Sequence, residues 1–225
     1  MTTPVLTIDG PSGSGKGTIA RQVSIALGWH LLDSGALYRL VGLASAKKGV
    51  STEIPGELAE LARHMNVRFG SDEQGNERIW LDGEEVSAQI RTEKAGERAS
   101  IVASIPAVRE ALLQFQRDCR KAPGLVADGR DMGTQVFADA ELKVFLTASA
   151  EERAKRRHKQ LNDKGIDVSL AALSRDIEDR DRRDSQRTVA PLTPAEDARL
   201  IDSSDLSIDD VTELVLGWAR EIWEM

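Results

Sequence analysis

The hydrophobic and polar positions of this chain form two alternating patterns. In one, apolar residues recur every three to four positions, which is typical of amphipathic helices. In the other, short and nearly continuous apolar runs resemble strands buried in a parallel sheet. These runs occupy residues 5–8, 30–33, 125–128, 142–146 and 200–202. Because strands alternate with helices, we predict an α/β fold in which helices flank a parallel sheet.

One segment departs from this alternation. Val67–Phe69 and Arg78–Leu81 alternate with a period of two, and the turn-forming residues 70–76 separate them. Asp82-Gly83 then favours another hairpin turn. We interpret the segment as a small antiparallel β unit inserted into the chain.

Composition narrows the class of protein. The 225 residues are enough for one large domain, and the net charge of −7 argues against coating nucleic acid or binding an anionic membrane. No apolar stretch approaches the roughly 20 residues of a membrane span, and we see no leader segment. The single cysteine, Cys119, excludes an internal disulfide and fits a cytoplasmic protein. His30, His64 and His158 lack the spacing of metal ligands, so we expect no zinc site.

A glycine-rich segment joins the first apolar run to the first helical pattern. It consists of Gly10, Pro11, Ser12, Gly13, Ser14, Gly15, Lys16, Gly17 and Thr18. Glycine lets the backbone turn its N–H groups inward, and a helix N-terminus adds positive potential, so the segment predicts a phosphate-binding loop. Lys16, which we expect in an exposed loop, would place its charge on the β- and γ-phosphates. The alternative is a glycine-rich turn that binds nothing.

A second polar cluster follows the strand predicted at residues 30–33. Arg39 lies about one helical turn beyond Ser34, where a guanidinium could hold a phosphate through two hydrogen bonds. Alternatively, Ser34 only caps the helix and Arg39 is solvated. The neighbouring phosphate loop favours the phosphate-binding interpretation.

A third cluster, residues 128–134, follows another predicted strand. Arg130 suits an anionic phosphate, and Asp131 suits a hydrogen-bond donor such as the exocyclic amine of cytosine. Asp128 could act near Mg²⁺. The alternative is an ion-paired turn without a ligand. Since ligands of parallel sheets bind at the carboxyl ends of strands, the three clusters together are stronger evidence than any one alone.

The most charged part of the chain is residues 175–187. Charge runs are usually solvated helix faces, but Arg180, Asp184 and Arg187 are four and three positions apart and share one helix face. An ionised Asp184 could accept a hydrogen bond from a ribose 2′-hydroxyl while Arg180 holds the carboxylate, or it could only pair with arginines. The preceding basic run, residues 153–159, could form a flap that excludes water from phosphoryl transfer.

Together these motifs resemble the bacterial cytidylate kinases, which are nucleoside-monophosphate kinases. The resemblance is carried by residues 8–18, 32–39, 128–134 and 180–191, and it covers essentially the whole chain. It implies a single P-loop kinase domain with a core (about 1–60, 92–150 and 188–225), a substrate-side insert (about 61–91) and a short helical lid (about 151–187). The order Lys-Gly-Thr matches this family, so Gly17 is no departure, and Mg²⁺ would be held mainly by phosphates and water.

The resemblance also implies roles for individual residues. The cytosine pocket would be lined by Ser34, Ser100, Arg109 and Asp131, with Tyr38 also in the substrate site. The monophosphate would be held by Arg39 and Arg130, and the sugar and phosphates by Arg180, Asp184 and Arg187. The catalytic residues would be Lys16, Arg130, Arg180 and Arg187, and Arg157 would join the loop in binding ATP. Without the resemblance, Ser100 and Arg109 would be ordinary helix residues.

The expected reaction transfers the γ-phosphate of ATP to CMP or dCMP, with Mg²⁺ as cofactor. The nearest alternative is a kinase of UMP or another small acceptor, although uracil offers Asp131 an acceptor where cytosine offers an amine. Another alternative is a non-enzymatic switch that hydrolyses ATP slowly. The second anion-binding cluster and the lack of a spare recognition segment argue against a switch. We expect a monomer that binds small molecules and neither nucleic acid nor membranes.

Overall fold

The computed structural model describes residues 2–72, 77–163, 165 and 167–224. It divides into two compact units, which we describe separately. The first unit comprises Met1–Asp33 and Arg117–Met225, and the second comprises Ser34–Gln116. The predicted turn at 70–76 falls partly outside the described residues.

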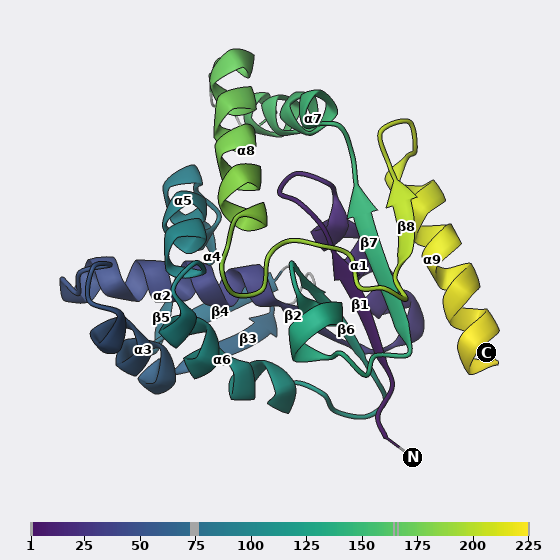
Figure 1. Cartoon of the computed structure of the whole chain (residues 1–225), viewed down its shortest axis with the longest axis horizontal. Coiled ribbons are helices and arrows are strands. Elements are labelled where there is room, and N and C mark those ends of the chain that lie inside the picture. Colours follow the sequence, from purple (N-terminus) through teal and green to yellow (C-terminus); the bar gives the residue numbers. More distant parts are fainter. Residues whose placement is uncertain (1, 73–76, 164, 166, 225) are drawn as a thin grey trace. The chain divides into compact units, whose positions relative to one another are not determined.

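The first unit is built on a parallel sheet of five strands in the order β2-β6-β1-β7-β8 (Figure 1). The strands are β1 (Val5–Asp9), β2 (His30–Asp33), β6 (Leu125–Gly129), β7 (Leu142–Thr147) and β8 (Arg199–Asp202). β1 is central and buried along its whole length, which explains why its residues are almost continuously apolar. Its carboxyl end leads directly into the glycine-rich segment.

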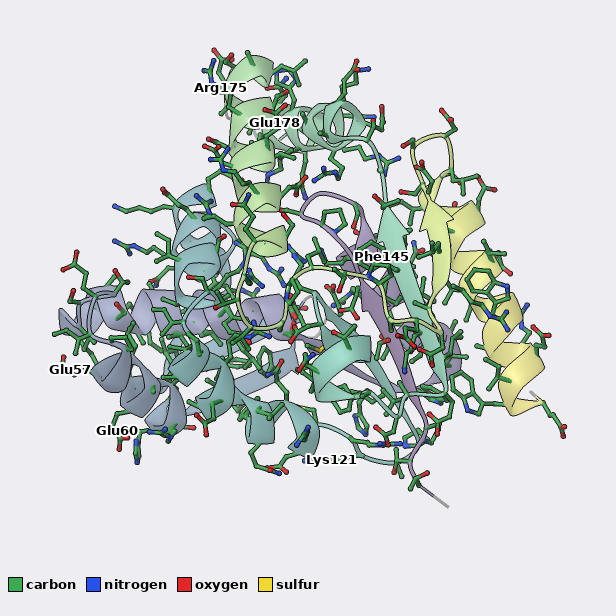
Figure 2. The ribbon with its side chains drawn as sticks, viewed as in Figure 1. Glu57, Glu60, Lys121, Phe145, Arg175 and Glu178 are labelled. Carbon is green, nitrogen blue, oxygen red and sulfur yellow. The ribbon has the colours of Figure 1, made fainter. Side chains whose placement is uncertain are left out.

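Helices complete the first unit. They are α1 (Lys16–Leu27), η1 (a π-helix, Met132–Val136), α7 (Ala150–Asn162), α8 (Leu170–Ser185) and α9 (Ile208–Trp223). Apolar residues of α1 and α9 form one core with the central strands, among them Ile19, Ile8, Val144 and Val215. On α8, Arg175 and Glu178 are exposed (Figure 2), as expected of a solvated charge run. Asp184 of the same helix is buried.

The second unit contains a three-stranded antiparallel sheet, ordered β3-β4-β5. Its elements are α2 (Ser34–Lys48), α3 (Pro55–His64), β3 (Val67–Ser71), β4 (Glu77–Leu81), β5 (Glu84–Glu85), α4 (Ser87–Ile90), α5 (Glu93–Val102) and α6 (Pro106–Asp118), the last of which continues past Gln116. Residues of α2 and β4, including Leu40 and Ile79, share an apolar core. At the turn before β5, Asp82 and Gly83 both have positive φ.

These elements confirm the α/β class with a parallel sheet, flanking helices and a small antiparallel unit. The division into core, insert and lid stays a prediction, and the second unit is larger than the predicted insert at 61–91. At the start of α7 the hydroxyl of Ser149 accepts from the N–H of Glu152 and caps the helix, while the carboxylate of Glu152 lies 3.4 Å from Arg156. In the described part of the chain, no helix is both long and apolar enough to cross a membrane.

Candidate active site

The glycine-rich loop connects the carboxyl end of β1 to the N-terminus of α1. A Cβ atom on Gly10 would lie 2.0 Å from the carbonyl oxygen of Leu146, so only glycine fits between the loop and β7. Gly15 caps α1 in the left-handed region, with φ of 91°. The Ser14 hydroxyl is buried in the loop and has no hydrogen-bond partner among the described residues. This unpartnered hydroxyl and the N-terminus of α1 together suit the binding of an anion in the loop.

Lys16 is buried rather than exposed, which corrects our expectation of an exposed loop. Its side chain donates to the carbonyl oxygen of Pro11 over 3.0 Å. Burial, followed by the positive charge of Arg130, lowers the pKa of the ammonium to about 8, while Asp128 acts in the opposite direction. An anion bound in the loop would favour the charged form.

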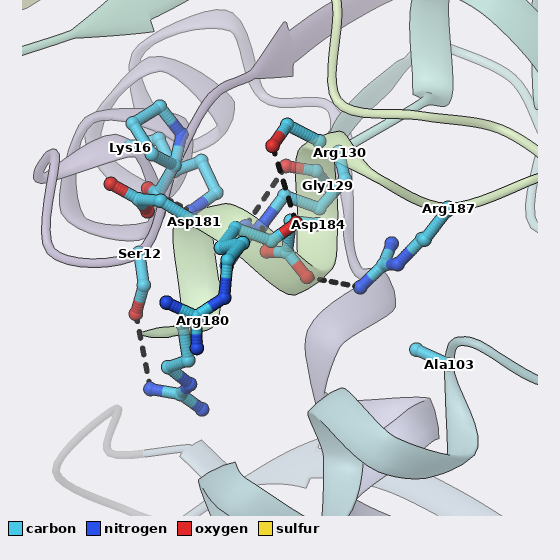
Figure 3. Close-up of polar contacts among 12 residues, drawn as sticks. Ser12, Lys16, Ala103, Gly129, Arg130, Arg180, Asp181, Asp184 and Arg187 are labelled. Atoms are coloured by element: carbon cyan, nitrogen blue, oxygen red, sulfur yellow. Dashed lines mark hydrogen bonds and ion pairs between the residues drawn. The ribbon is translucent and has the colours of Figure 1, made fainter. Parts of the chain in front are cut away.

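A compact ion cluster lies at the carboxyl end of β6 (Figure 3). Arg130 donates through Nε to Asp184 over 2.9 Å, and Arg187 donates to the other carboxylate oxygen. Burial acts to raise the pKa of Asp184, but Arg130 and Arg187 outweigh it, and the pKa lies below its usual range. The cluster therefore holds two guanidinium groups on one ionised carboxylate, and its net charge is positive.

Arg180 points toward the phosphate loop instead of toward Asp184. Its Nη1 donates to the hydroxyl of Ser12 over 3.2 Å (Figure 3). The expectation that Arg180 holds the carboxylate of Asp184 is thus not met by its hydrogen bond, although the charges of the two groups interact. Burial and the neighbouring Arg130 lower the pKa of Arg180 to about 10, so it stays cationic at neutral pH.

Arg153 was expected in a basic flap, but it is a buried linking residue. It donates to the backbone oxygen of Ser12 over 2.9 Å and to that of Ala148 over 3.0 Å, and it pairs with Asp181 of α8. The side chain thereby joins α7, α8 and the phosphate loop. Arg157, on the next turn of α7, is half-buried and donates to Gln160. Burial lowers the pKa of Arg157.

Three carboxylates approach the same end of the sheet. Asp9 accepts hydrogen bonds from the N–H groups of Met132 and Gly133, over 2.9 and 2.8 Å. Burial raises the pKa of Asp9 to about 7 against the effect of these bonds, and the charges of Asp131 and Asp128 also raise it. Asp131 and Asp128 are buried as well.

Asp128 also lies against the phosphate loop. A Cβ atom on Gly17 would come within 3.1 Å of its Oδ2. The carboxylate therefore occupies space beside the position where a serine or threonine follows the lysine in other phosphate loops. Within residues 2–72, 77–163, 165 and 167–224, no group of three or more His, Cys, Asp or Glu residues could hold a metal ion. Asp128 thus places one carboxylate directly against Gly17 of the loop.

The remaining predicted residues belong to the second unit. Ser34 is buried at the start of α2, and Ser100 is buried on α5, which packs against α2. Arg39 donates to the carbonyl oxygen of Ile90 over 2.7 Å. Arg109 donates to that of Ala103 over 3.2 Å, and its guanidinium lies 5.7 Å from the ring centre of Tyr38. Within this unit Arg109 therefore lies near the ring of Tyr38, and Arg39 hydrogen-bonds to Ile90, the last residue of α4.

Comparison with known proteins identifies the family. Residues 6–221 match the model of the family described as cytidylate kinase. The chain belongs to the cytidylate kinase family. It is 58% identical to a cytidylate kinase of Cupriavidus pinatubonensis over 95% of each chain, and 60% identical to one of Pseudomonas entomophila over 94% of this chain and 93% of that one. A cytidylate kinase of Pseudomonas paraeruginosa is 58% identical over 96% of this chain and 97% of its own.

Two residues of this cytidylate kinase family member were not singled out from the sequence. Asp9 ends a buried strand directly before the glycine-rich loop, and this placement of an acid is a signal that could have been used. Arg153 belongs to a basic run in which its neighbours are more exposed. Nothing in the sequence separates it from them, because its burial depends on the packing of α7 against α8.

Proposed function

We propose that this chain transfers the γ-phosphoryl group of ATP to CMP or dCMP, giving ADP and CDP or dCDP. The observation that supports this most is the cationic cluster of Arg130, Asp184 and Arg187 beside the phosphate loop. The phosphate loop would bind one nucleotide, and the cationic cluster would bind the phosphate of a second. Two such sites suit the transfer of a phosphoryl group between two anions. Membership of the cytidylate kinase family agrees with this reaction.

The reaction needs no covalent intermediate, because a nucleoside monophosphate is already a nucleophile. Its rate depends on in-line positioning and on neutralising the charge of the transferred group. Lys16, with a pKa of about 8, carries most of its charge at neutral pH and is held by Pro11 before a ligand binds. Further positive charge would come from three partly or largely buried arginines, Arg130, Arg180 and Arg187.

In this proposal the acceptor is recognised by the residues that the family resemblance implies. Asp131 would accept a hydrogen bond from the amine of cytosine, with Ser34, Tyr38, Ser100 and Arg109 also contributing to the substrate site. Arg39 and Arg130 would bind the monophosphate, and Asp184 would accept from the ribose 2′-hydroxyl. The loop from Gly10 to Thr18 and Arg157 would bind ATP. The buried Ser14 hydroxyl supports the loop assignment, since a phosphate oxygen would satisfy it.

Mg²⁺ would accompany ATP and neutralise charge on the transferred phosphoryl group. The family resemblance implies a metal held mainly by phosphates and water, and Asp128, whose Oδ2 would lie 3.1 Å from a Cβ atom on Gly17, is an acid placed against the loop. The carboxylate of Asp128 would orient water from the position that a hydroxyl side chain takes in other loops. We further propose a cytoplasmic monomer without nucleic-acid or membrane partners.

A coupled assay of ADP release tests the proposal. We expect turnover with CMP or dCMP and Mg-ATP, and far weaker turnover with UMP, because a lost buried hydrogen bond and opposed acceptors cost about 1–3 kcal/mol or more. Equal rates with UMP and CMP would exclude Asp131 as the group that reads the base. A slow rate of ADP release that stays the same with and without a nucleoside monophosphate would favour the ATP-hydrolysing switch instead.

A further inference from the structure

Asp9 joins the phosphate loop to the turn that carries Asp131. It is the last residue of β1 and immediately precedes Gly10, the first residue of the loop. Its side chain crosses to the segment that follows β6, where both carboxylate oxygens are used: Oδ1 accepts from Met132 N and Oδ2 from Gly133 N. One side chain therefore fixes the two residues that follow Asp131.

The same turn is held from its other side. The carbonyl oxygen of Asp131 accepts from the N–H of Gln135 over 2.9 Å, within the π-helical turn η1. Asp131 itself has φ of −148° and ψ of 23°, outside regular helix or strand geometry. Since no regular ladder fixes this backbone, the bonds from Asp9 to Met132 and Gly133 help to fix where the turn after Asp131 begins.

The carboxylate is costly to keep at this place. Asp9 is only 5% exposed, and it lies near two other acids, Asp128 and Asp131. A buried polar group that cost stability without a role could be replaced by an apolar one. The two backbone N–H donors require a carboxylate at this position. A neutral, isosteric asparagine could accept from only one of them and would present a donor to the other.

We propose that Asp9 is a positioning residue for base recognition. From the end of β1, directly before the loop, it sets the position of Asp131. This inference rests on the proposed function, in which Asp131 accepts from the amine of cytosine. Loss of the Asp9 bonds would displace the acceptor that distinguishes cytosine from uracil. The ATP-binding loop would be affected less, because Gly10 and Gly15 are fixed by their own backbone geometry.

The test compares Asp9→Asn with wild type and with Val144→Ala. Val144 is buried on β7, pairs in register with Ile8 of β1 and has an apolar side chain that cannot hydrogen-bond to the turn. Its truncation to alanine therefore controls for a general loss of stability. We expect Asp9→Asn to lower the ratio of kcat/KM for CMP to that for UMP by about tenfold, with the KM for ATP changed by less than about threefold. Val144→Ala should keep the wild-type ratio.

Hydrogen exchange measures the same contact without activity. In Asp9→Asn, amides of residues 131–136 should exchange about tenfold faster than in wild type relative to those of α9, and in Val144→Ala they should not. An unchanged CMP to UMP ratio, unchanged exchange in the turn, or the same changes in Val144→Ala would overturn the inference. If wild type itself does not distinguish CMP from UMP, the proposed function fails, and the exchange measurement still decides whether Asp9 holds the turn.

Discussion

Lys16 is a buried cation at the start of α1, held by the carbonyl oxygen of Pro11. Its charge is therefore in place before any phosphate arrives, and little reorganisation is needed during transfer. The burial that lowers its pKa to about 8 also strengthens its attraction for an anion. At the scale of single residues, we expect this preorganised charge to be the main contribution of Lys16 to the proposed transfer.

Removal of this charge should affect the chemical step. We expect Lys16→Ala to lower kcat by about 10²–10³-fold, because the ammonium acts on charge that develops in the transition state. Steady-state kinetics with CMP and ATP measure the change, and a thermal melt verifies that the variant is folded. A folded variant with nearly normal kcat would show that the loop has only a structural role.

Asp184 allows a test of sugar recognition. Its carboxylate already accepts from Arg130 and Arg187, which supports the alternative that it only orders the arginines, but each oxygen can accept another bond. We expect Asp184→Ala to reduce kcat/KM more for CMP than for dCMP, by roughly 1–2 kcal/mol. Damage to the arginine cluster is common to both substrates and cancels in the comparison. Equal losses would assign Asp184 to the ion cluster alone.

At the scale of elements, the strands were the easiest part to predict. β2 was predicted with its observed bounds, and β1, β6 and β7 within one residue at each end, because buried parallel strands require continuous apolar runs. The π-helix η1 and the short helix α4 were missed. Neither has a periodic pattern, and the first two residues of η1 donate to Asp9 on a strand that is distant in sequence.

The site was predictable to a similar extent. The loop, Arg130 and Asp184 follow from glycine placement and from charges at strand ends, which are local signals. The burial of Lys16, the bond from Arg180 to Ser12 and the linking role of Arg153 are not local, since each joins segments that are more than 130 residues apart or depends on the packing around the loop. Sequence spacing alone carries no information about such contacts.

Arg153 of α7 contacts both Asp181 of α8 and the Ser12 carbonyl oxygen of the loop. We expect Arg153→Met to destabilise the protein by about 2–4 kcal/mol and to raise the KM for ATP, because it leaves Asp181 and the Ser12 carbonyl without this donor. Arg182→Met is the matched control. Arg182 pairs with Asp179 on the exposed side of α8, so its loss should cost at most about 0.5 kcal/mol. Similar urea midpoints for both variants would contradict the linking role.

At the scale of the whole molecule, Asp9 should make stability depend on pH. Its pKa rises from 3.8 in the unfolded chain to about 7 in the folded protein, so its favourable contribution is complete below about pH 4 and is lost as the pH rises through 7. This difference corresponds to about 4 kcal/mol. Urea unfolding at pH 5 and pH 8 should therefore show a larger decrease in stability for wild type than for Asp9→Asn. Equal decreases would show that Asp9 is ionised throughout this range.

The fate of the γ-phosphate distinguishes transfer between two nucleotides from hydrolysis of ATP. The measurement uses ATP labelled at the γ-phosphate, with CMP and Mg²⁺, and separates the labelled products by chromatography. We predict that the label appears in CDP in step with ADP formation, and that inorganic phosphate stays at background. Label that accumulates in inorganic phosphate, at a rate independent of CMP, would contradict a kinase and support the ATP-hydrolysing switch.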